Sequence, residues 1–468
     1  MRLCIAGTTL RTVCSVALMV GAFAFGLSVT VAQEEPRELD YYGDKTTITV
    51  AEDDGPSFEY VIQEQKQKDA KKGKKQKSSG KKKSSGKGKQ PPRPRVSPPT
   101  TPEPTAPTRR RRTRQTASSR SRSMSNLPEI FGDIFGTAGR LDIVTMQPGG
   151  QGPPIISTSS IDLITGGGNR RMKTAENNRS LPTDRIIFQY NHFHNAGSFV
   201  TSGAPPTNNQ FPIDRYVFGV EKTFFDEQWS LEVRLPFTGF NGAGGVGPAG
   251  PTAVDGGTWG NVNFILKHIL REGDTGVLAA GVAVDVPTGS DTVATIGASQ
   301  ITLENQAYHV APYIGMSLVP TEDSFIQFFA QVDFTANGND ATLNTGSVPL
   351  ELGSYNEQNL LYLDLAVGHW LFQDPDAERI TGLAGIVELH YTTALQDTDA
   401  VTSAFGNESF LISSSINRFD VLNLTAGLHL EVAETSMLRV AAVVPLTGSG
   451  LDNRFFDAEI QAVFNRRF

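Results

Sequence analysis

The feature that most constrains the fold is a series of twelve segments, most of them about 10 to 12 residues long, in which apolar and polar residues alternate. In "WSLEVRLPF", for example, Leu231 and Val233 alternate with Glu232 and Arg234. A period of two is typical of a strand with one apolar and one polar face, and this length suits a tilted crossing of a bilayer. We expect the segments near residues 185–194, 214–225, 229–237, 260–270, 276–287, 307–318, 324–334, 360–371, 380–391, 420–431, 436–446 and 455–468.

The connections between these segments alternate in length. Joins such as "DEQ", "REGD" and "PTED" are short, whereas the joins between them are mostly long and Gly-rich, as in "TGFNGAGGVGPAGPTAVDGGT". Short turns at one end and long loops at the other are typical of outer-membrane barrels, whereas a secreted sandwich or jelly roll has no reason to sort its loops this way. We predict an all-β fold, a 12-stranded antiparallel transmembrane β-barrel over residues 184–468, with a disordered basic N-terminal arm. Both termini are expected in the periplasm, below the outer membrane of a Gram-negative-type bacterium.

The final segment, "FFDAEIQAVFNRRF", places Ile460, Phe464 and Phe468 on one face. We expect this strand to pair with the first one, because an unpaired edge in lipid costs several kcal/mol for each unsatisfied backbone group. A terminal aromatic residue on the lipid face is similar to the signature that bacterial outer-membrane proteins present to their insertion machinery. Arg466 on the same face departs from that pattern, and a long cationic side chain can reach the interface.

The N-terminus is predicted to be a secretory signal peptide over residues 1–32, in which a positive region is followed by an apolar run and small residues up to Ala32. An uncleaved membrane anchor is the alternative reading. Both cysteines, Cys4 and Cys14, lie in this segment, so we expect neither disulfides nor thiolate metal sites in the mature chain. An acidic segment over residues 33–65 follows.

Residues 66–125 form the basic arm. Between Lys66 and Arg122, 12 Lys and 9 Arg face only two acids, a net charge of +19. With almost no apolar residues to bury, the arm is expected to be disordered. Behind a signal peptide, its expected partner is a polyanion of the cell envelope or lipid headgroups rather than nucleic acid, and a solvated spacer is the other reading. Residues 126–183 are predicted to be a linker with one short helix around Ile130, Phe131, Ile134 and Phe135.

If the apolar faces of the strands contact lipid, their polar faces line the lumen. Eight acids and three bases would then point inward, an excess that attracts cations. The alternative is that these charges pair and fill a narrow lumen. The predicted lumen-facing residues are Glu221, Glu232, Arg234, Lys267, Asp285, Asp333, Asp364, Glu388, Glu431, Arg439 and Glu459.

The sequence shows no pattern that indicates a catalytic, metal or cofactor site. His309, His390 and His429 lie on three different segments, and their spacing does not show that they converge on an ion. A barrel lipase needs a Ser beside an activating His on the outer wall, and no His-x-Ser pair occurs in any segment. We therefore expect neither an enzyme nor a metal or other cofactor.

Three stretches, "ENNRSLPTDRIIFQYNHFHN", "VDVPTGS" and "FFDAEIQAVFNRRF", resemble a family of outer-membrane barrels linked to the meta-pathway of phenol degradation. The resemblance covers roughly residues 175–468 and leaves out the basic arm. It implies a channel or transporter for small hydrophobic or aromatic compounds and supplies no catalytic residues. We expect an outer-membrane channel for small solutes, hydrophobic or cationic. The alternative is a structural anchor whose arm binds peptidoglycan or another polyanion. Solute and oligomeric state stay open.

Overall fold

The computed structural model describes residues 47–49, 59–61, 122–133, 139–147, 154–166, 169–202, 207–239, 242–247, 250–346, 349–374, 376–397, 399–414, 418–433, 435–448 and 454–468. Backbone contacts divide the chain into two units, Met1–Arg112 and Thr113–Phe468. In the first unit, strands β1 (Thr47–Thr49) and β2 (Glu59–Val61) pair as an antiparallel hairpin. The predicted signal peptide, most of the acidic segment and nearly all of the basic arm lie outside the described residues.

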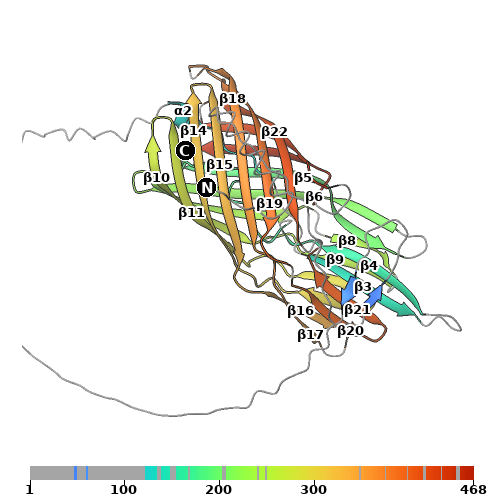
Figure 1. Ribbon diagram of the computed structural model, residues 1–468. Coiled ribbons are helices and arrows are strands. Elements are labelled where there is room, and N and C mark those ends of the chain that lie inside the picture. Colours follow the sequence, from blue (N-terminus) through green and yellow to red (C-terminus); the bar gives the residue numbers. More distant parts are fainter. Residues whose placement is uncertain are drawn as a thin grey trace, which may run out of the picture. The chain divides into compact units, whose positions relative to one another are not determined.

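The second unit is built on antiparallel strands that close into a barrel (Figure 1). Strand β5 pairs with β6 on one side and with the last strand, β24, on the other, so the ring has no open edge. This confirms the predicted 12-stranded barrel and its closure by the C-terminal segment. The barrel strands are β5 (Arg185–Thr201), β6 (Thr207–Phe224), β7 (Trp229–Thr238), β10 (Val262–Gly273), β11 (Gly276–Val286), β14 (His309–Thr321), β15 (Ser324–Thr335), β18 (Leu360–Gln373), β19 (Ile380–Ala394), β22 (Asp420–Val432), β23 (Ser436–Pro445) and β24 (Ala458–Arg467).

The alternation within the strands places apolar side chains outside and polar side chains inside. In β7, Glu232 and Arg234 are buried, whereas Leu231 between Ser230 and Glu232 is 42 % exposed. This arrangement is the reverse of a soluble β-protein and is the one that a lipid environment selects. Large apolar side chains are exposed on strands all around the barrel, among them Ile186, Phe218, Phe264, Ile314, Val367, Val387, Leu428, Val440 and Ile460.

Short turns join the barrel strands at one end, which we call the turn end. The C-terminal Phe468 also lies there, where its amide donates to the Asp184 carbonyl just before β5 begins. At the opposite, loop end the long connections fold into further strands, a feature that sequence analysis missed (Figure 1). These strands are β8 (Gly242–Gly247), β9 (Gly250–Asp255), β12 (Thr292–Ile296), β13 (Ser299–Leu303), β16 (Asn339–Asn344), β17 (Leu350–Tyr355), β20 (Val401–Phe405) and β21 (Glu408–Ser413).

The loop-end strands build a cap with its own apolar core. Six of them form a sheet in the order β17-β16-β13-β12-β9-β8, while β20 and β21 extend the sheet that contains β5 through the hairpin of β3 (Gly139–Gln147) and β4 (Ile155–Leu163). Side chains of both sheets meet in one buried cluster, to which Ile143 of β3, Ile301 of β13 and Ile412 of β21 contribute. Burial of this apolar surface stabilises the cap over the loop end.

Residues 122–184 connect the arm to the barrel by crossing the lumen twice. The outgoing pass, residues 122–133, begins at the turn end with helix α2 (Arg122–Ser125). The β3–β4 hairpin then becomes part of the cap, where β4 pairs with the loop-end part of β5. The return pass, residues 169–184, leads back to the turn end and into β5. We call the two passes together the plug.

The plug corrects the prediction of a linker with a short helix between residues 126 and 183. The described helix lies earlier, at Arg122–Ser125, and Ile130 instead forms an isolated β-bridge with Asn178 of the return pass. Ile134 and Phe135 lie outside the described residues. At Gly132 the two passes come so close that a β-carbon would lie 2.6 Å from the α-carbon of Glu176, and its φ of +77° also favours glycine.

Candidate functional site: the plugged lumen

All eleven residues predicted to line the lumen are buried, the most exposed being Glu431 at 4 %. They lie on the strand faces opposite the exposed apolar residues, and many contact the plug. Two further buried cations, Arg185 of β5 and Arg215 of β6, were missed. Arg215 is six residues before Glu221 on the same strand, so the alternation of strand faces would have placed it in the lumen too. The faces of β5 were left unassigned because polar His192 and His194 lie among the outer-face residues.

At the turn end of the lumen, arginine and lysine pair with two glutamates of the wall. Arg185 contacts Glu221 at 2.7 Å and Glu232 at 2.9 Å, and Lys267 contacts Glu221 at 3.1 Å. Arg234 also pairs with Glu232 and reaches the plug through the Lys173 carbonyl at 3.3 Å. These charges compensate one another within the wall, as buried ion pairs must.

Just outside this network, Asp184 marks the start of β5. Its carboxylate accepts hydrogen bonds from the Lys222 ammonium and from the amide and hydroxyl of Thr223. Burial acts to raise the pKa of Asp184, but these hydrogen bonds outweigh it and hold the pKa below its usual value. Lys222 is 64 % exposed, so this pair is a surface salt bridge.

Towards the loop end, the return pass is held by its cations. Arg171 contacts Glu357 at 3.1 Å and Asp333 at 3.7 Å, and Arg170 donates to Asn339 at 3.0 Å. Close by, the amide of Met172 donates to Asp285 at 3.4 Å. The plug thus meets two of the predicted acids at this level.

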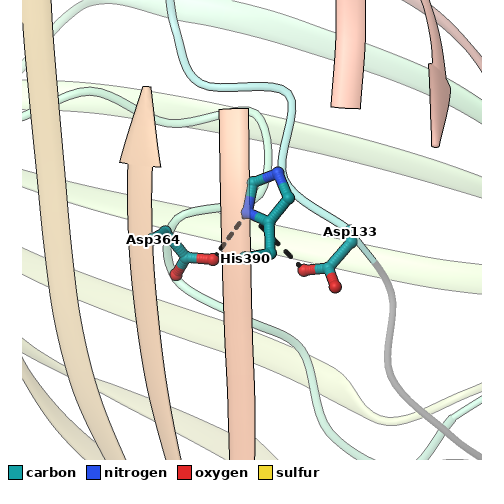
Figure 2. Close-up of side chains that lie close together, drawn as sticks. All are labelled: Asp133, Asp364 and His390. Atoms are coloured by element: carbon teal, nitrogen blue, oxygen red, sulfur yellow. Dashed lines mark hydrogen bonds and ion pairs between the residues drawn. The ribbon is translucent and has the colours of Figure 1, made fainter. Parts of the chain in front are cut away.

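The centre of the lumen contains a cluster formed by both passes and two wall strands (Figure 2). His390 of β19 lies 2.7 Å from Asp364 of β18 through Nδ1, and the same nitrogen is 3.8 Å from Asp133 of the outgoing pass. Lys173 of the return pass contacts Asp133 and also Asp364, the latter at 2.8 Å. Glu388, next to His390 on the same strand face, is 3.1 Å from its Nε2.

Asp133, Asp364 and His390 have the spacing of metal ligands, with candidate atoms within 4.8 Å of one another. The Lys173 ammonium, however, hydrogen bonds to both carboxylates and so fills the position that a cation would need. Both ring nitrogens of His390 face carboxylates, Nδ1 that of Asp364 and Nε2 that of Glu388. The chemistry of the group is therefore that of a salt-bridge cluster joining the plug to the wall. His309 and His429 take no part in it and lie in other contacts.

Backbone groups of the plug are also bound by wall side chains. The Glu388 carboxylate accepts the amides of Phe131 and Gly132 at 2.7 and 3.0 Å, and Gln331 accepts the amide of Thr174 at 2.7 Å. On β24, Gln461 donates to the Gly132 carbonyl at 2.9 Å, whereas Glu459 accepts at 2.6 Å from Asn191 of the wall strand β5. Such bonds satisfy an extended chain that has no sheet partner of its own.

One Ser–His pair lies on the outer wall. Ser324 of β15 and His369 of β18 are cross-strand neighbours, with Oγ 3.0 Å from Nδ1. Sequence inspection missed this pair because it considered pairs within one strand only. Among the described residues, no carboxylate forms an ion pair with His369, so the third member of a catalytic triad is missing there.

Ile460, Phe464 and Phe468, the predicted closure signature, are 57, 40 and 63 % exposed on the outer face. Among the described residues, no helix has the length and apolar character needed to span a membrane. The closed ring of strands with an apolar exterior is an outer-membrane β-barrel.

Comparison with known proteins found no matching family model and no matching curated protein. Among solved structures, the COG4313 outer membrane channel from Pseudomonas putida F1 is similar at 14 % identity and a TM-score of 0.38, over 62 % of this chain and 96 % of that chain. The Pseudomonas putida toluene transporter TodX is similar at 10 % identity and 0.34, over 65 % and 96 %. The KdgM porin is similar at 7 % identity and 0.29, over 61 % and 99 %. Likeness of this extent assigns neither a family nor a solute.

Proposed function

We propose that this protein is an outer-membrane channel for small solutes, and that its plug closes the lumen in the described conformation. The observation that supports this most is the lumen itself, which is wide enough to hold two extended passes of chain between its walls. A shift of one pass would leave space for a small solute. The turn end, with its short connections and both ends of the barrel domain, would face the periplasm.

The composition of the lumen supports a solute that is hydrophobic or cationic. Apolar residues on the lumen face of β10, β11, β14 and β15, such as Ile265, Val277 and Phe329, belong to one buried cluster with Leu127 and Ile130 of the plug. Taken together, the described barrel strands bury eight acids against five bases, and the bases are Arg185, Arg215, Arg234, Lys267 and Arg439. With the plug displaced, the exposed wall would therefore combine apolar side chains with an excess of negative charge, which attracts cations.

Several buried polar atoms support a closed state that can open. Among the described residues, Asn423 Oδ1, Thr425 Oγ1 and Glu459 Oε2 of the wall have no hydrogen-bond partner. Each such group costs about 1–3 kcal/mol relative to a satisfied one. Entry of water on opening would satisfy them, whereas a permanent seal would be more stable with apolar side chains at these positions.

Conductance in planar bilayers tests this proposal. Wild-type protein should give rare openings, and Lys173→Met, which removes the cation that joins the plug to the wall, should open far more often. The reversal potential in a KCl gradient should show cation preference. A Lys173→Met barrel that stays silent, or that prefers anions, would contradict the proposal.

The alternative is a structural envelope anchor whose basic arm binds peptidoglycan or another polyanion. Two observations favour it. The lumen is filled, and the first plug residues lie at the turn end, from which the arm would extend into the periplasm. Deletion of residues 66–122 should then abolish pulldown by peptidoglycan and leave the barrel folded. Unchanged pulldown would count against the anchor.

A further inference from the structure

Several guanidinium groups converge at the turn end of the lumen around one plug carboxylate. Glu129 of the outgoing pass lies 4.0 Å from Arg179 of the return pass and 3.6 Å from Arg185 of β5. Arg439 of β23 donates to the backbone carbonyl of Glu129, and Arg467 of β24 is the cross-strand neighbour of Arg185. Glu129 is fully buried, so these charges act through a medium that screens them weakly.

None of these guanidinium groups hydrogen bonds to the Glu129 carboxylate. Among the described residues, neither carboxylate oxygen of Glu129 has a hydrogen-bond partner, and the same holds for Nε of Arg439 and for Nε and Nη2 of Arg467. The donors of Arg179 go to neutral acceptors, the carbonyls of Ser125 and Leu127 and the hydroxyl of Thr183. Buried charged donors thus converge here without oxygen acceptors that match their charge.

The other charges nearby are engaged elsewhere. Arg185 has its own partners in Glu221 and Glu232. Glu388, which also acts on Arg439, accepts two amides of the plug. Among the described residues, the 4.0 Å contact of Arg179 with Glu129 is the one ion pair that Arg179, Arg439 or Arg467 forms with a carboxylate. Burial of a charge without a closely paired counterion is costly. A guanidinium fork is the side chain that suits carboxylate and phosphate oxygens best.

The site is close to solvent at the turn end, away from the cap. Ser125, whose carbonyl accepts from Arg179, is exposed, and the Arg467 side chain is partly exposed one residue before the C-terminus. The unpaired Nε and Nη2 of Arg467 are themselves covered, so an anion would reach them from this side by displacing neighbouring side chains, without passing the central cluster.

We propose that the turn end of the lumen carries an oxyanion-binding site formed by Arg179, Arg439 and Arg467 beside Glu129. Its ligand is a small carboxylate or phosphate, whose oxygens accept from the free Arg467 and Arg439 donors. The site needs no opening of the plug, so it does not depend on the proposed channel function.

Calorimetric titration of the full-length protein in detergent tests the site, with inorganic phosphate and benzoate as separate probes at constant ionic strength. Saturable binding of phosphate alone would assign phosphate chemistry, and of benzoate alone carboxylate chemistry. Arg467→Gln should weaken binding at least about tenfold, the loss expected for one charge-assisted hydrogen bond. Arg466→Gln is the matched control, because this neighbouring arginine is exposed on the lipid face. Heat-modifiable migration in electrophoresis verifies that each variant barrel is folded.

Glu129→Gln provides a second variant, which should tighten binding because it removes the anion that competes for the same arginines. The absence of saturable binding for both probes, or equal weakening by Arg466→Gln and Arg467→Gln, would overturn the site. Because the titration involves no transport, its failure leaves the channel proposal standing, and a silent channel leaves the site standing.

Discussion

Lys173→Met should release the plug from the wall at the centre of the lumen. The Lys173 side chain is 2 % exposed and its ammonium contacts both Asp133 and Asp364. Methionine keeps most of the volume and removes the charge, which leaves two buried carboxylates beside the His390 ring. Removal of one partner of a buried ion pair costs about 3–5 kcal/mol. Since every 1.4 kcal/mol is a factor of ten, local opening should become roughly two to three and a half orders of magnitude more frequent.

Hydrogen exchange of the plug amides measures this opening. Exchange should become about two to three and a half orders of magnitude faster at three plug amides. These are the amides of Phe131 and Gly132, which Glu388 binds, and of Thr174, which Gln331 binds. Lys222→Met is the matched control, since Lys222 also pairs with an aspartate but is 64 % exposed, and such pairs contribute about 0–1 kcal/mol. Equal acceleration by both variants, or none with Lys173→Met, would refute the reasoning.

Three further outcomes are expected. Gly132→Ala should loosen the plug, because its β-carbon would meet the backbone of Glu176 at a positive φ, and faster exchange of the plug amides would show it. Leu141→Ala, which leaves a void in the cap core, should destabilise the β3–β4 hairpin by about 2–5 kcal/mol in exchange measurements. Burial raises the pKa of Asp162 in the cap, so the folded protein holds a proton on this carboxyl at pH values where the unfolded chain has lost it. The stability of the cap should therefore fall as pH rises through that raised pKa. Thermal unfolding of Asp162→Asn should show a smaller pH slope.

The barrel could be predicted because each spanning strand must expose apolar side chains to lipid on one face. That requirement imposes the period of two that reveals β7, β15 and β22 within a few residues of their observed bounds. The C-terminal strand was equally clear, because Ile460 and Phe464 recur on its outer face.

The plug and the cap could not be predicted from the same signal. The return pass is extended without a sheet partner and is held by side chains of nine barrel strands, so its sequence shows no periodic pattern of apolar residues. Its unusual density of charge, with Arg170, Arg171, Lys173 and Arg179 in one stretch, was the available indication. Four cations in a predicted loop beside an acidic lumen could have suggested that the loop enters it.

The central claim is that the plug fills the lumen, and thiol labelling tests it most directly because residues 33–468 contain no cysteine. Thr425, fully buried in the wall beside Glu388, and Thr402, exposed in the cap, can each be replaced by cysteine. A charged, water-soluble thiol reagent should modify Thr402→Cys quickly and leave Thr425→Cys unmodified, until Lys173→Met is added. Equal labelling rates at the two positions in the otherwise wild-type protein would show that the lumen is open to water and contradict the account.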